Sequence, residues 1–377
     1  IRYIKMATTN FAALTSEQKT AWARDLWRVA RNTSFINQFA SKGHNAMVQR
    51  IETLTKSEKG ARAVLTLVAD LEGDGIAGDA TLEGNEEAMK AYDTVIQIDQ
   101  LRHANRLQGR MADQKSIINF REQSRDKLGY WMGDRLDQMA FLSMSSLPYT
   151  LNTNGSTRST NVLSTLEFAP AANVAPTTNR CVHIKSSGVT AGTGFAAADG
   201  VLTAMTYKDI VNLKAHAKDN YIRGIKGAAG EEVYHLFITP QGMAQLKLDT
   251  DFIANVRHAG VRGDKNSLFK GTDSVMVDGV IIHEFRHVFD TRGAASGSKM
   301  CASGNTEGQR ALLCGAQALG MADLGTAYWD EDFFDYNNQP GIACGKIFGF
   351  LKPQFKGNPA NPTLLEDFGV ITVDTAL

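Results

Sequence analysis

The clearest hydrophobic pattern in the chain is a stripe at three- and four-residue steps within residues 113–144. The stripe consists of Ile117, Phe120, Ser124, Leu128, Trp131, Met132, Leu136, Met139 and Leu142. Most charged residues of the segment fall outside it, so the spacing predicts one amphipathic helix. At a rise of about 1.5 Å per residue, such a helix extends for roughly 45 Å. That length exceeds the globular average, and we expect the helix to act as a strut.

Before this helix the hydrophobic period changes to two. Segments 48–54 and 61–69 carry β-branched and leucine positions around the polar stretch 55–60, which predicts a β-hairpin. Residues 94–98 predict a third strand. The charged, glycine-rich loop 72–87 lies between the second and third strands, and long loops of this kind are usually functional or disordered. We expect this loop to reach a neighbouring subunit.

Near the N-terminus, large apolar residues recur at helical spacing within residues 16–39. They are Trp22, Leu26, Trp27, Val29 and Phe35. The segment has no obvious partner in the sequence. Two interpretations stay open, an arm that docks on another subunit and a helix that packs on its own domain.

The second half of the chain mixes strands and helices without regular alternation, which predicts an α+β fold. Residues 151–200 are rich in Ser, Thr, Asn, Ala and Gly and predict an irregular insertion with one short hairpin. The Asp278-Gly279 dipeptide predicts a turn. The remaining expected elements are helices over 206–218, 240–248 and 309–325, and strands over 233–238, 274–285, 347–355 and 370–373.

Composition narrows the function classes. The chain has 377 residues, enough for two domains, and equal numbers of Lys plus Arg and Asp plus Glu, 40 each. Zero net charge gives no global attraction to nucleic acid or acidic membranes. No run approaches the roughly 20 apolar residues of a membrane helix, and residues 1–6 lack the apolar core of a secretory signal. We therefore expect a soluble protein that stays in the cytoplasm, with Met6 as the natural start.

The four cysteines form no C-x-x-C pair, so neither a zinc framework nor a disulfide framework is indicated. They are Cys181, Cys301, Cys314 and Cys344. We expect buried free thiols, which is the usual environment of such residues.

The sequence His283-Glu284-Phe285-Arg286-His287 matches the H-E-x-x-H motif of zinc peptidases. That motif requires a helix, which places both histidines on one face. Here the surrounding valines and isoleucines predict a strand, along which positions i and i+4 are about 13 Å apart. A strand with surface histidines is the favoured interpretation, and a zinc hydrolase using His283, Glu284 and His287, with Glu307 as a distant third ligand, is the alternative.

Residues 73–78 match G-x-G-x-x-G, but no predicted helix follows, and the nearby carboxylates would repel pyrophosphate. The same region starts like a calcium loop at Asp70, Glu72 and Asp74, yet Thr81 stands where the bidentate glutamate is needed. Both patterns favour an acidic turn-rich loop that pairs with basic residues across a subunit contact.

Three segments resemble one family of tailed-bacteriophage major capsid proteins, the podovirus coat proteins. They are L-E-G-N-E-E at 82–87, I-D-Q-L-R-H-A at 98–104 and D-F-G-V-I-T-V-D-T-A at 367–376. The resemblance is strongest over 50–141, and it implies the Hong Kong phage 97-type capsid fold. The layout it implies is an N-terminal arm 1–47, an extended loop 48–105, a peripheral domain 106–202 built on a spine helix 113–144, an axial domain 203–328, and a return to the peripheral domain over 329–377.

The resemblance also implies a non-enzymatic function. The subunit would form hexamers and pentamers of an icosahedral shell around double-stranded DNA, with scaffolding, portal and decoration proteins as partners, no cofactor and no membrane. A nanocompartment shell protein is a further alternative. The candidates for subunit contact are Trp22, Trp27, Glu72, Asp74, Asp79, Glu83, Glu86, Glu87, Arg102, Arg106 and Arg110. The acidic members would meet a neighbour's basic surface, and the arginines either form a solvated face or contact an acidic loop or DNA phosphates.

Overall fold

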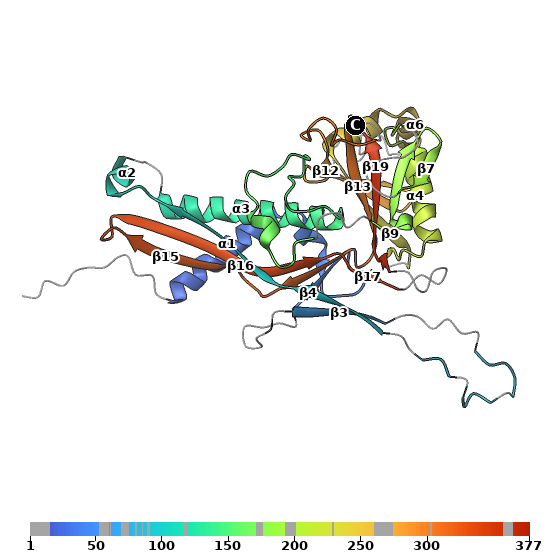
Figure 1. The fold of residues 1–377 in the computed structure, drawn as a ribbon, viewed down its shortest axis with the longest axis horizontal. Helices are drawn as coiled ribbons and strands as arrows, with labels where there is room; N and C mark the ends of the chain where they lie inside the picture. The colour runs from blue at the N-terminus through green and yellow to red at the C-terminus, as the bar shows by residue number, and fades with distance from the viewer. Residues whose placement is uncertain are drawn as a thin grey trace, which may run out of the picture. The chain divides into compact units, whose positions relative to one another are not determined.

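The computed structural model describes residues 16–52, 60, 62–68, 75–79, 81–84, 86–88, 91–115, 119–170, 176–192, 201–227, 230–259, 274–301, 304–356 and 365–377. The chain divides into two compact units (Figure 1). The smaller unit comprises Ile1–Phe35, Gln100–Leu136 and Leu324–Phe348, and the larger comprises Ile36–Asp99, Asp137–Asp323 and Gly349–Leu377. No helix among the described residues is long and apolar enough to cross a membrane.

The smaller unit combines helices with a long antiparallel strand pair. Its elements are α1 (Ser16–Thr33), β5 (Asp99–Arg106), α2 (Arg110–Lys115), the first part of α3 (Phe120–Met144), β15 (Tyr328–Phe334) and most of β16 (Gln339–Leu351). Strand β15 pairs with β16 from Tyr328↔Gly345 to Phe334↔Gln339, and β5 also pairs with β16. The rest of α3, from Asp137, belongs to the larger unit.

The predicted strut is present, but as two helices. Helix α2 ends at Lys115 and α3 begins at Phe120. The predicted stripe is buried at Leu128, Met132 and Leu136. The helix expected over 16–39 ends earlier, at Thr33, and a 3₁₀ helix (Ile36–Phe39) follows.

Two glycines of α3 allow α1 to approach closely. A Cβ on Gly133 would lie 2.9 Å from the Ala30 carbonyl oxygen, and one on Gly129 would lie 3.0 Å from Cγ1 of Val29. Glycine lowers helix propensity. The close helix contact explains why it is nevertheless present here.

A nine-stranded sheet dominates the larger unit. Its order is β10-β11-β9-β13-β19-β6-β7, with β12 on β13 and β8 on β9. The strands are β6 (Cys181–Lys185), β7 (Gly188–Ala191), β8 (Ile225–Lys226), β9 (Glu232–Ile238), β10 (Ser274–Val277), β11 (Val280–Glu284), β12 (Phe289–Asp290), β13 (Gly308–Cys314) and β19 (Val370–Ala376). Strands β9 and β11 are parallel, as are β19 and β6, whereas β13 is antiparallel to both β9 and β19.

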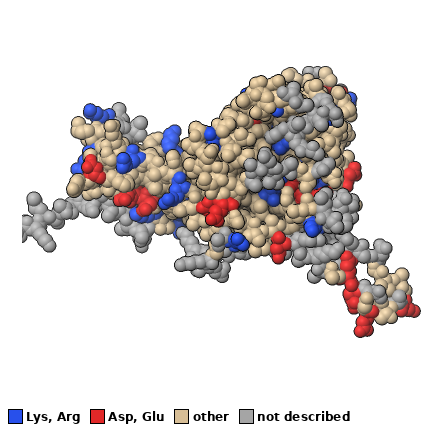
Figure 2. Space-filling model, viewed as in Figure 1, with Lys and Arg blue, Asp and Glu red and all other residues tan. Residues whose placement is uncertain are grey.

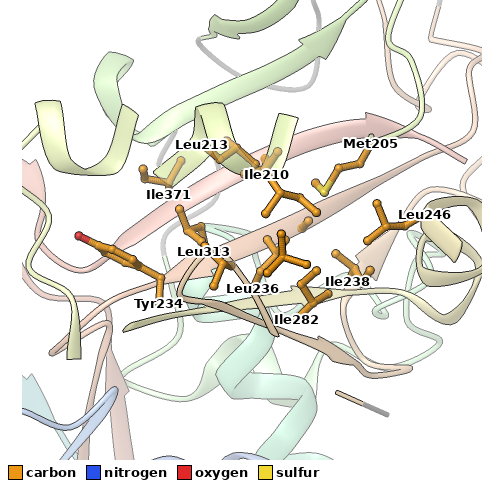
Figure 3. Close-up of a cluster of buried hydrophobic side chains, with 14 of the residues drawn as sticks. Met205, Ile210, Leu213, Tyr234, Leu236, Ile238, Leu246, Ile282, Leu313 and Ile371 are labelled. Atoms are coloured by element: carbon orange, nitrogen blue, oxygen red, sulfur yellow. The ribbon is translucent and has the colours of Figure 1, made fainter. Parts of the chain in front are cut away.

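Helices and this sheet enclose the main apolar core. Besides the end of α3, the larger unit contains α4 (Tyr207–Asp219), α5 (Pro240–Leu248) and α6 (Thr250–Ala259). Ile210 and Leu213 of α4 and Leu246 of α5 pack with Leu236 and Ile282 of the sheet (Figure 3). Their burial removes apolar surface from water, which is the main favourable contribution to folding.

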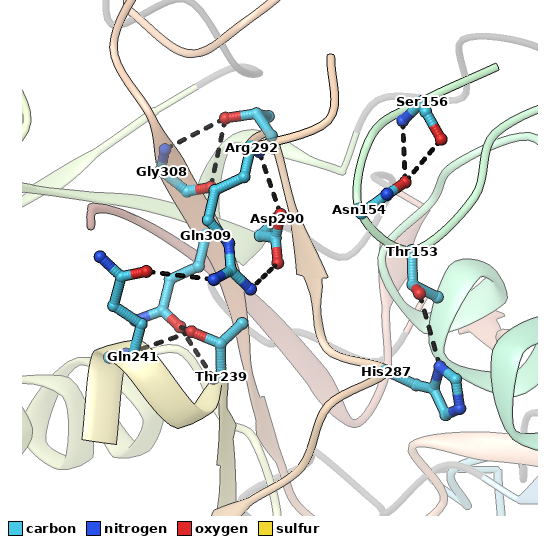
Figure 4. Close-up of polar contacts among 12 residues, drawn as sticks. Thr153, Asn154, Ser156, Thr239, Gln241, His287, Asp290, Arg292, Gly308 and Gln309 are labelled. Atoms are coloured by element: carbon cyan, nitrogen blue, oxygen red, sulfur yellow. Dashed lines mark hydrogen bonds and ion pairs between the residues drawn. The ribbon is translucent and has the colours of Figure 1, made fainter. Parts of the chain in front are cut away.

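A buried glutamine fixes the start of α5 (Figure 4). The Oε1 atom of Gln309, on β13, accepts hydrogen bonds from the backbone N–H and the hydroxyl of Thr239 at 2.8 and 2.6 Å. The Thr239 hydroxyl oxygen in turn accepts from the Gly242 N–H at 3.2 Å, which satisfies one of the free donors at the helix N-terminus. This contact joins helix and sheet inside the unit.

The hairpin predicted between 48–54 and 61–69 is wrong. Strand β2 (Val48–Ile51) instead lies in parallel between β1 (Ala40–Ser41) and β14 (Leu319–Asp323). Strand β3 (Arg62–Val68) pairs antiparallel with β4 (Ala91–Gln97). Strand β4 corresponds to the third strand predicted over residues 94–98. Periodicity identifies a strand but not its partner, and β2 pairs with residues far along the chain.

The helix predicted over 309–325 is also wrong, because the segment forms β13 and β14. Every residue of both strands is buried. A strand that is buried on both faces shows no alternation of apolar and polar residues, so its pattern cannot be told from that of a buried helix. Strand β15 and helix α6 were not predicted. The strand expected over 347–355 is the end of β16 followed by β17 (Gln354–Phe355), which pairs with β18 (Glu366–Asp367).

Other expectations are confirmed. Residues 151–200 contain a hairpin, β6–β7, and short 3₁₀ helices (Val162–Thr165 and Thr178–Arg180). Asp278 and Gly279 form the turn between β10 and β11 with φ values of 46° and 76°. All four cysteines are free and buried. The predicted domain boundaries remain a prediction. Within the predicted final segment 329–377, strand β19 lies between β13 and β6 in the nine-stranded sheet.

Candidate subunit-contact surfaces

The loop between β3 and β4 exposes carboxylates. Asp79, Glu83, Glu86 and Glu87 are all exposed. Figure 2 shows acidic side chains, in red, on the protruding part of the surface that this loop forms. Gly75, Gly78 and Gly84 adopt positive φ values of 73°, 68° and 88°, which permit the turns. Leu82 is 63% exposed. We name this segment, 75–88, the acidic loop; Glu72 and Asp74 lie outside the described residues.

The acidic loop does not have the geometry of a dinucleotide site. A pyrophosphate site needs a helix that begins at the last glycine of the motif. The residues described after Gly78 form turns and irregular backbone before β4 begins at Ala91. This supports the interpretation of the motif as a turn-rich loop.

The predicted arginine cluster lies on and after β5. Arg102 and Arg106 are exposed on this strand, two positions on either side of Ala104, and therefore share a face. Arg102 hydrogen-bonds the Tyr328 hydroxyl, and the Arg106 guanidinium lies 5.2 Å from the centroid of the Phe334 ring.

Carboxylates share this surface of the smaller unit. A recess of about 210 Å³ is lined by Arg106 together with Asp330, Asp332 and Phe334. Asp330 also accepts a hydrogen bond from Lys19 at 2.8 Å. The surface is therefore of mixed charge rather than basic. Arg110, at the start of α2, instead donates to the Asn337 carbonyl at 3.3 Å.

Helix α1 packs within its own unit. Trp27 is 7% exposed, and the Lys346 ammonium lies 3.5 Å from its ring centroid. Trp22 is half-buried and stacks on Trp329 with centroids 5.7 Å apart. Of the two interpretations of this helix, packing on its own unit accounts for Trp27, and only Trp22 keeps surface for a neighbour.

The opposite face of α1 carries three exposed arginines that the sequence reasoning missed. They are Arg24, Arg28 and Arg31, at helical positions i, i+4 and i+7. This spacing places them in one row. The sequence could have revealed this row, because the three arginines have helical spacing and lie between the residues of the predicted apolar face.

The H-E-x-x-H residues are not brought together. His283 pairs with His235, and the Nδ1 atom of His235 lies 2.8 Å from Nε2 of His283. The expected surface position is wrong for His287, which lies after the strand and is buried, with its Nδ1 3.4 Å from the Thr153 hydroxyl (Figure 4). Glu284 pairs with Lys247 at 3.7 Å. The three side chains have three separate partners, so the zinc-hydrolase alternative is not supported.

A different trio of possible ligand residues lies close together in the described part of the larger unit. Cys181, His183 and Asp374 have ligand atoms within 4.8 Å of one another, and all are buried. Both carboxylate oxygens of Asp374, however, accept hydrogen bonds from Arg310, at 2.7 and 2.8 Å. A buried guanidinium that already neutralises the carboxylate disfavours a cation, and the group is better described as a buried ion pair.

The His235–His283 pair predicts a pH dependence. Burial lowers the pKa of each imidazole to about 4, and for His283 the neighbouring His235 adds to this effect. Since the unfolded chain has a value near 6.5, it binds more protons than the folded chain below that pH. The stability contributed by the pair is complete above pH 6.5 and is lost as the pH falls toward 4.

We expect the variant His235→Phe/His283→Phe to lose less stability over this interval than the unchanged chain. Thermal melting of the unassembled subunit across the interval provides the measurement. Carboxylates titrate in both proteins, so the difference between the two curves isolates the histidines. Parallel curves would contradict the expectation.

Comparison with known proteins gives a consistent result. A family described as phage capsid protein matches residues 10–377. The major capsid protein of Pseudomonas phage KPP25 is 53% identical over 370 residues, covering 98% of this chain and 97% of that protein. The capsid of Ralstonia phage GP4 matches 99% of this chain and 95% of its own, with a TM-score of 0.72 and 24% identity. The capsid of cyanophage Pam1 matches 100% and 96%, with a TM-score of 0.66 and 16% identity. The predicted α+β capsid fold is confirmed.

Proposed function

The chain belongs to the phage capsid protein family, and we propose that it is the major capsid protein of a tailed bacteriophage. The observation that carries this function is the 53% identity to a phage major capsid protein over nearly the whole length of both chains. The aligned region covers 98% of this chain and therefore includes the acidic loop, the strut and both units. The chain is a structural protein.

The finer proposals concern assembly. Copies of the subunit form hexamers and pentamers that close into an icosahedral shell around double-stranded DNA, with scaffolding, portal and decoration proteins as partners. Assembly takes place in the host cytoplasm. Closed symmetry lets many weak contacts between identical subunits add up to a stable particle.

Three surfaces are candidates for subunit contact. The first is the acidic loop, with Asp79, Glu83, Glu86 and Glu87. The second is the mixed-charge surface around Arg102 and Arg106, together with Arg110, and the third is the exposed part of Trp22. The exposure of these side chains to solvent supports them as contact candidates. The loop buries no described carboxylate, and an exposed leucine lies among these charges at position 82. Such a segment gains favourable contacts only when another surface covers it.

Sedimentation of the purified chain, expressed alone and with its scaffolding protein, tests the proposal. We expect large uniform particles, sheets or tubes in at least one of the two preparations. A stable monomer at high concentration in both would overturn it.

A further inference from the structure

The outer face of α1 forms a basic row. Arg24, Arg28 and Arg31 are exposed, while Leu26, Trp27 and Ala30 on the other side of the helix are buried. Within the described part of the chain, Arg28 pairs with Asp25 at 3.3 Å, and Arg24 and Arg31 form no ion pair. Residues four apart on a helix lie about 6 Å from each other, so the row presents closely spaced positive charge. We call it the arginine row.

The acidic loop has the opposite property. Residues 75–88 contain four carboxylates and neither lysine nor arginine, and the sequence just before them adds Asp70, Glu72 and Asp74. Four of these carboxylates are described, and all four are exposed. Like charges held in one short loop repel one another, and a basic surface that covers them relieves this repulsion.

The arginines of β5 are a poorer counterpart for the loop. Asp330 and Asp332 line the same recess as Arg106, and Asp330 is 64% exposed. An acidic loop placed there would meet carboxylates as well as guanidinium groups. Like-charge juxtaposition suppresses wrong partners, so the arginine row is the better electrostatic match.

We propose that the arginine row of α1 receives the acidic loop of a neighbouring copy of this chain. The proposal rests on the proposed function, because it identifies one contact of the assembled shell. The contact is heterologous, since the loop of one copy meets the helix of the next. A heterologous contact of this kind generates rings, as capsomers require.

The test uses two charge reversals of equal size. Arg24→Glu/Arg28→Glu alters the row, and Arg102→Glu/Arg106→Glu alters the competing surface on β5; in both pairs the two residues lie four positions apart. We expect the row variant to lower the particle yield about tenfold or more, because each repeated contact becomes repulsive. Adding Glu83→Lys/Glu86→Lys to the row variant should restore particles.

Circular dichroism of the unassembled variants establishes that they are folded. If the row variant does not fold, cross-linking decides instead. Particles that mix chains carrying Arg28→Cys with chains carrying Glu83→Cys should give disulfide-linked pairs under mild oxidation, and particles of either variant alone should not. The native cysteines are buried and leave this signal clear.

Three results would overturn the proposal: a normal particle yield from the row variant, restoration of the β5 variant rather than the row variant by the loop reversal, or no disulfide-linked pairs in the mixed particles. Particles formed in normal yield but lacking DNA would instead assign the row to nucleic-acid phosphates. If the unchanged chain forms no particles under the same conditions, the proposed function itself fails.

Discussion

Replacing Asp374 with alanine is expected to lower the free energy of unfolding of the unassembled subunit by about 3–5 kcal/mol. Asp374 lies on β19, and its carboxylate forms two hydrogen bonds to Arg310 on the neighbouring strand β13, at 2.7 and 2.8 Å. The two side chains are 0% and 3% exposed. Without the carboxylate, the guanidinium stays buried without its counter-charge.

Burial opposes the charge of Arg310, but Asp374 outweighs this effect and raises its pKa, so the arginine stays protonated. Denaturant unfolding of the variant measures the loss. The double replacement Arg310→Met/Asp374→Leu should be more stable than Asp374→Ala, because an apolar pair leaves no charge uncompensated. A loss below about 1 kcal/mol for Asp374→Ala would contradict the account, since that is the range of surface ion pairs.

Replacing Phe237 with alanine is expected to cost about 3–5 kcal/mol. Phe237 lies on β9 in the larger unit and is 0% exposed. Its ring makes edge-to-face contacts with Phe39 and Phe141, at centroid distances of 5.4 and 5.5 Å, and stacks on His283 at 5.2 Å. The truncation removes all three contacts and leaves a cavity.

The same unfolding experiment checks this expectation. Phe237→Leu keeps most of the volume and should cost less than Phe237→Ala. Leu82→Ala, on the exposed acidic loop, should change the stability by no more than about 0.5 kcal/mol. Equal losses for Phe237→Ala and Leu82→Ala would show that the assigned core is wrong.

Local patterns identified most of the elements. The stripe through Leu128, Met132 and Leu136 predicted the strut, and the Asp278-Gly279 turn predicted the strand pair around it. Both signals depend on residues close in sequence. The resemblance over residues 82–104 added the fold family, which no periodicity could supply.

Non-local pairing accounts for the errors. Strand β2 pairs with β14 at Val48↔Leu319, and nothing within residues 48–51 indicates that partner. Strand β13 was mistaken for a helix because it lies inside the sheet, between β9 and β19, with every residue buried, so its sequence shows no alternation of apolar and polar positions.

The candidate contact surfaces can be derived from the sequence less completely than the fold. Exposed carboxylates in the acidic loop follow from composition alone. That Asp332 shares a recess with Arg106 depends on how β5, β15 and β16 are arranged, which the sequence does not reveal. The arginine row becomes meaningful only once Trp27 is known to be buried on the other side of α1.

The central claim is that this chain is the repeating subunit of a closed phage shell. An electron cryomicroscopy reconstruction of particles assembled from it tests that claim most directly. We expect an icosahedral lattice in which density for this fold occupies every position and each acidic loop lies against an adjacent copy. Particles whose shell is built from a different chain, with this one absent or bound only as an isolated monomer, would contradict it.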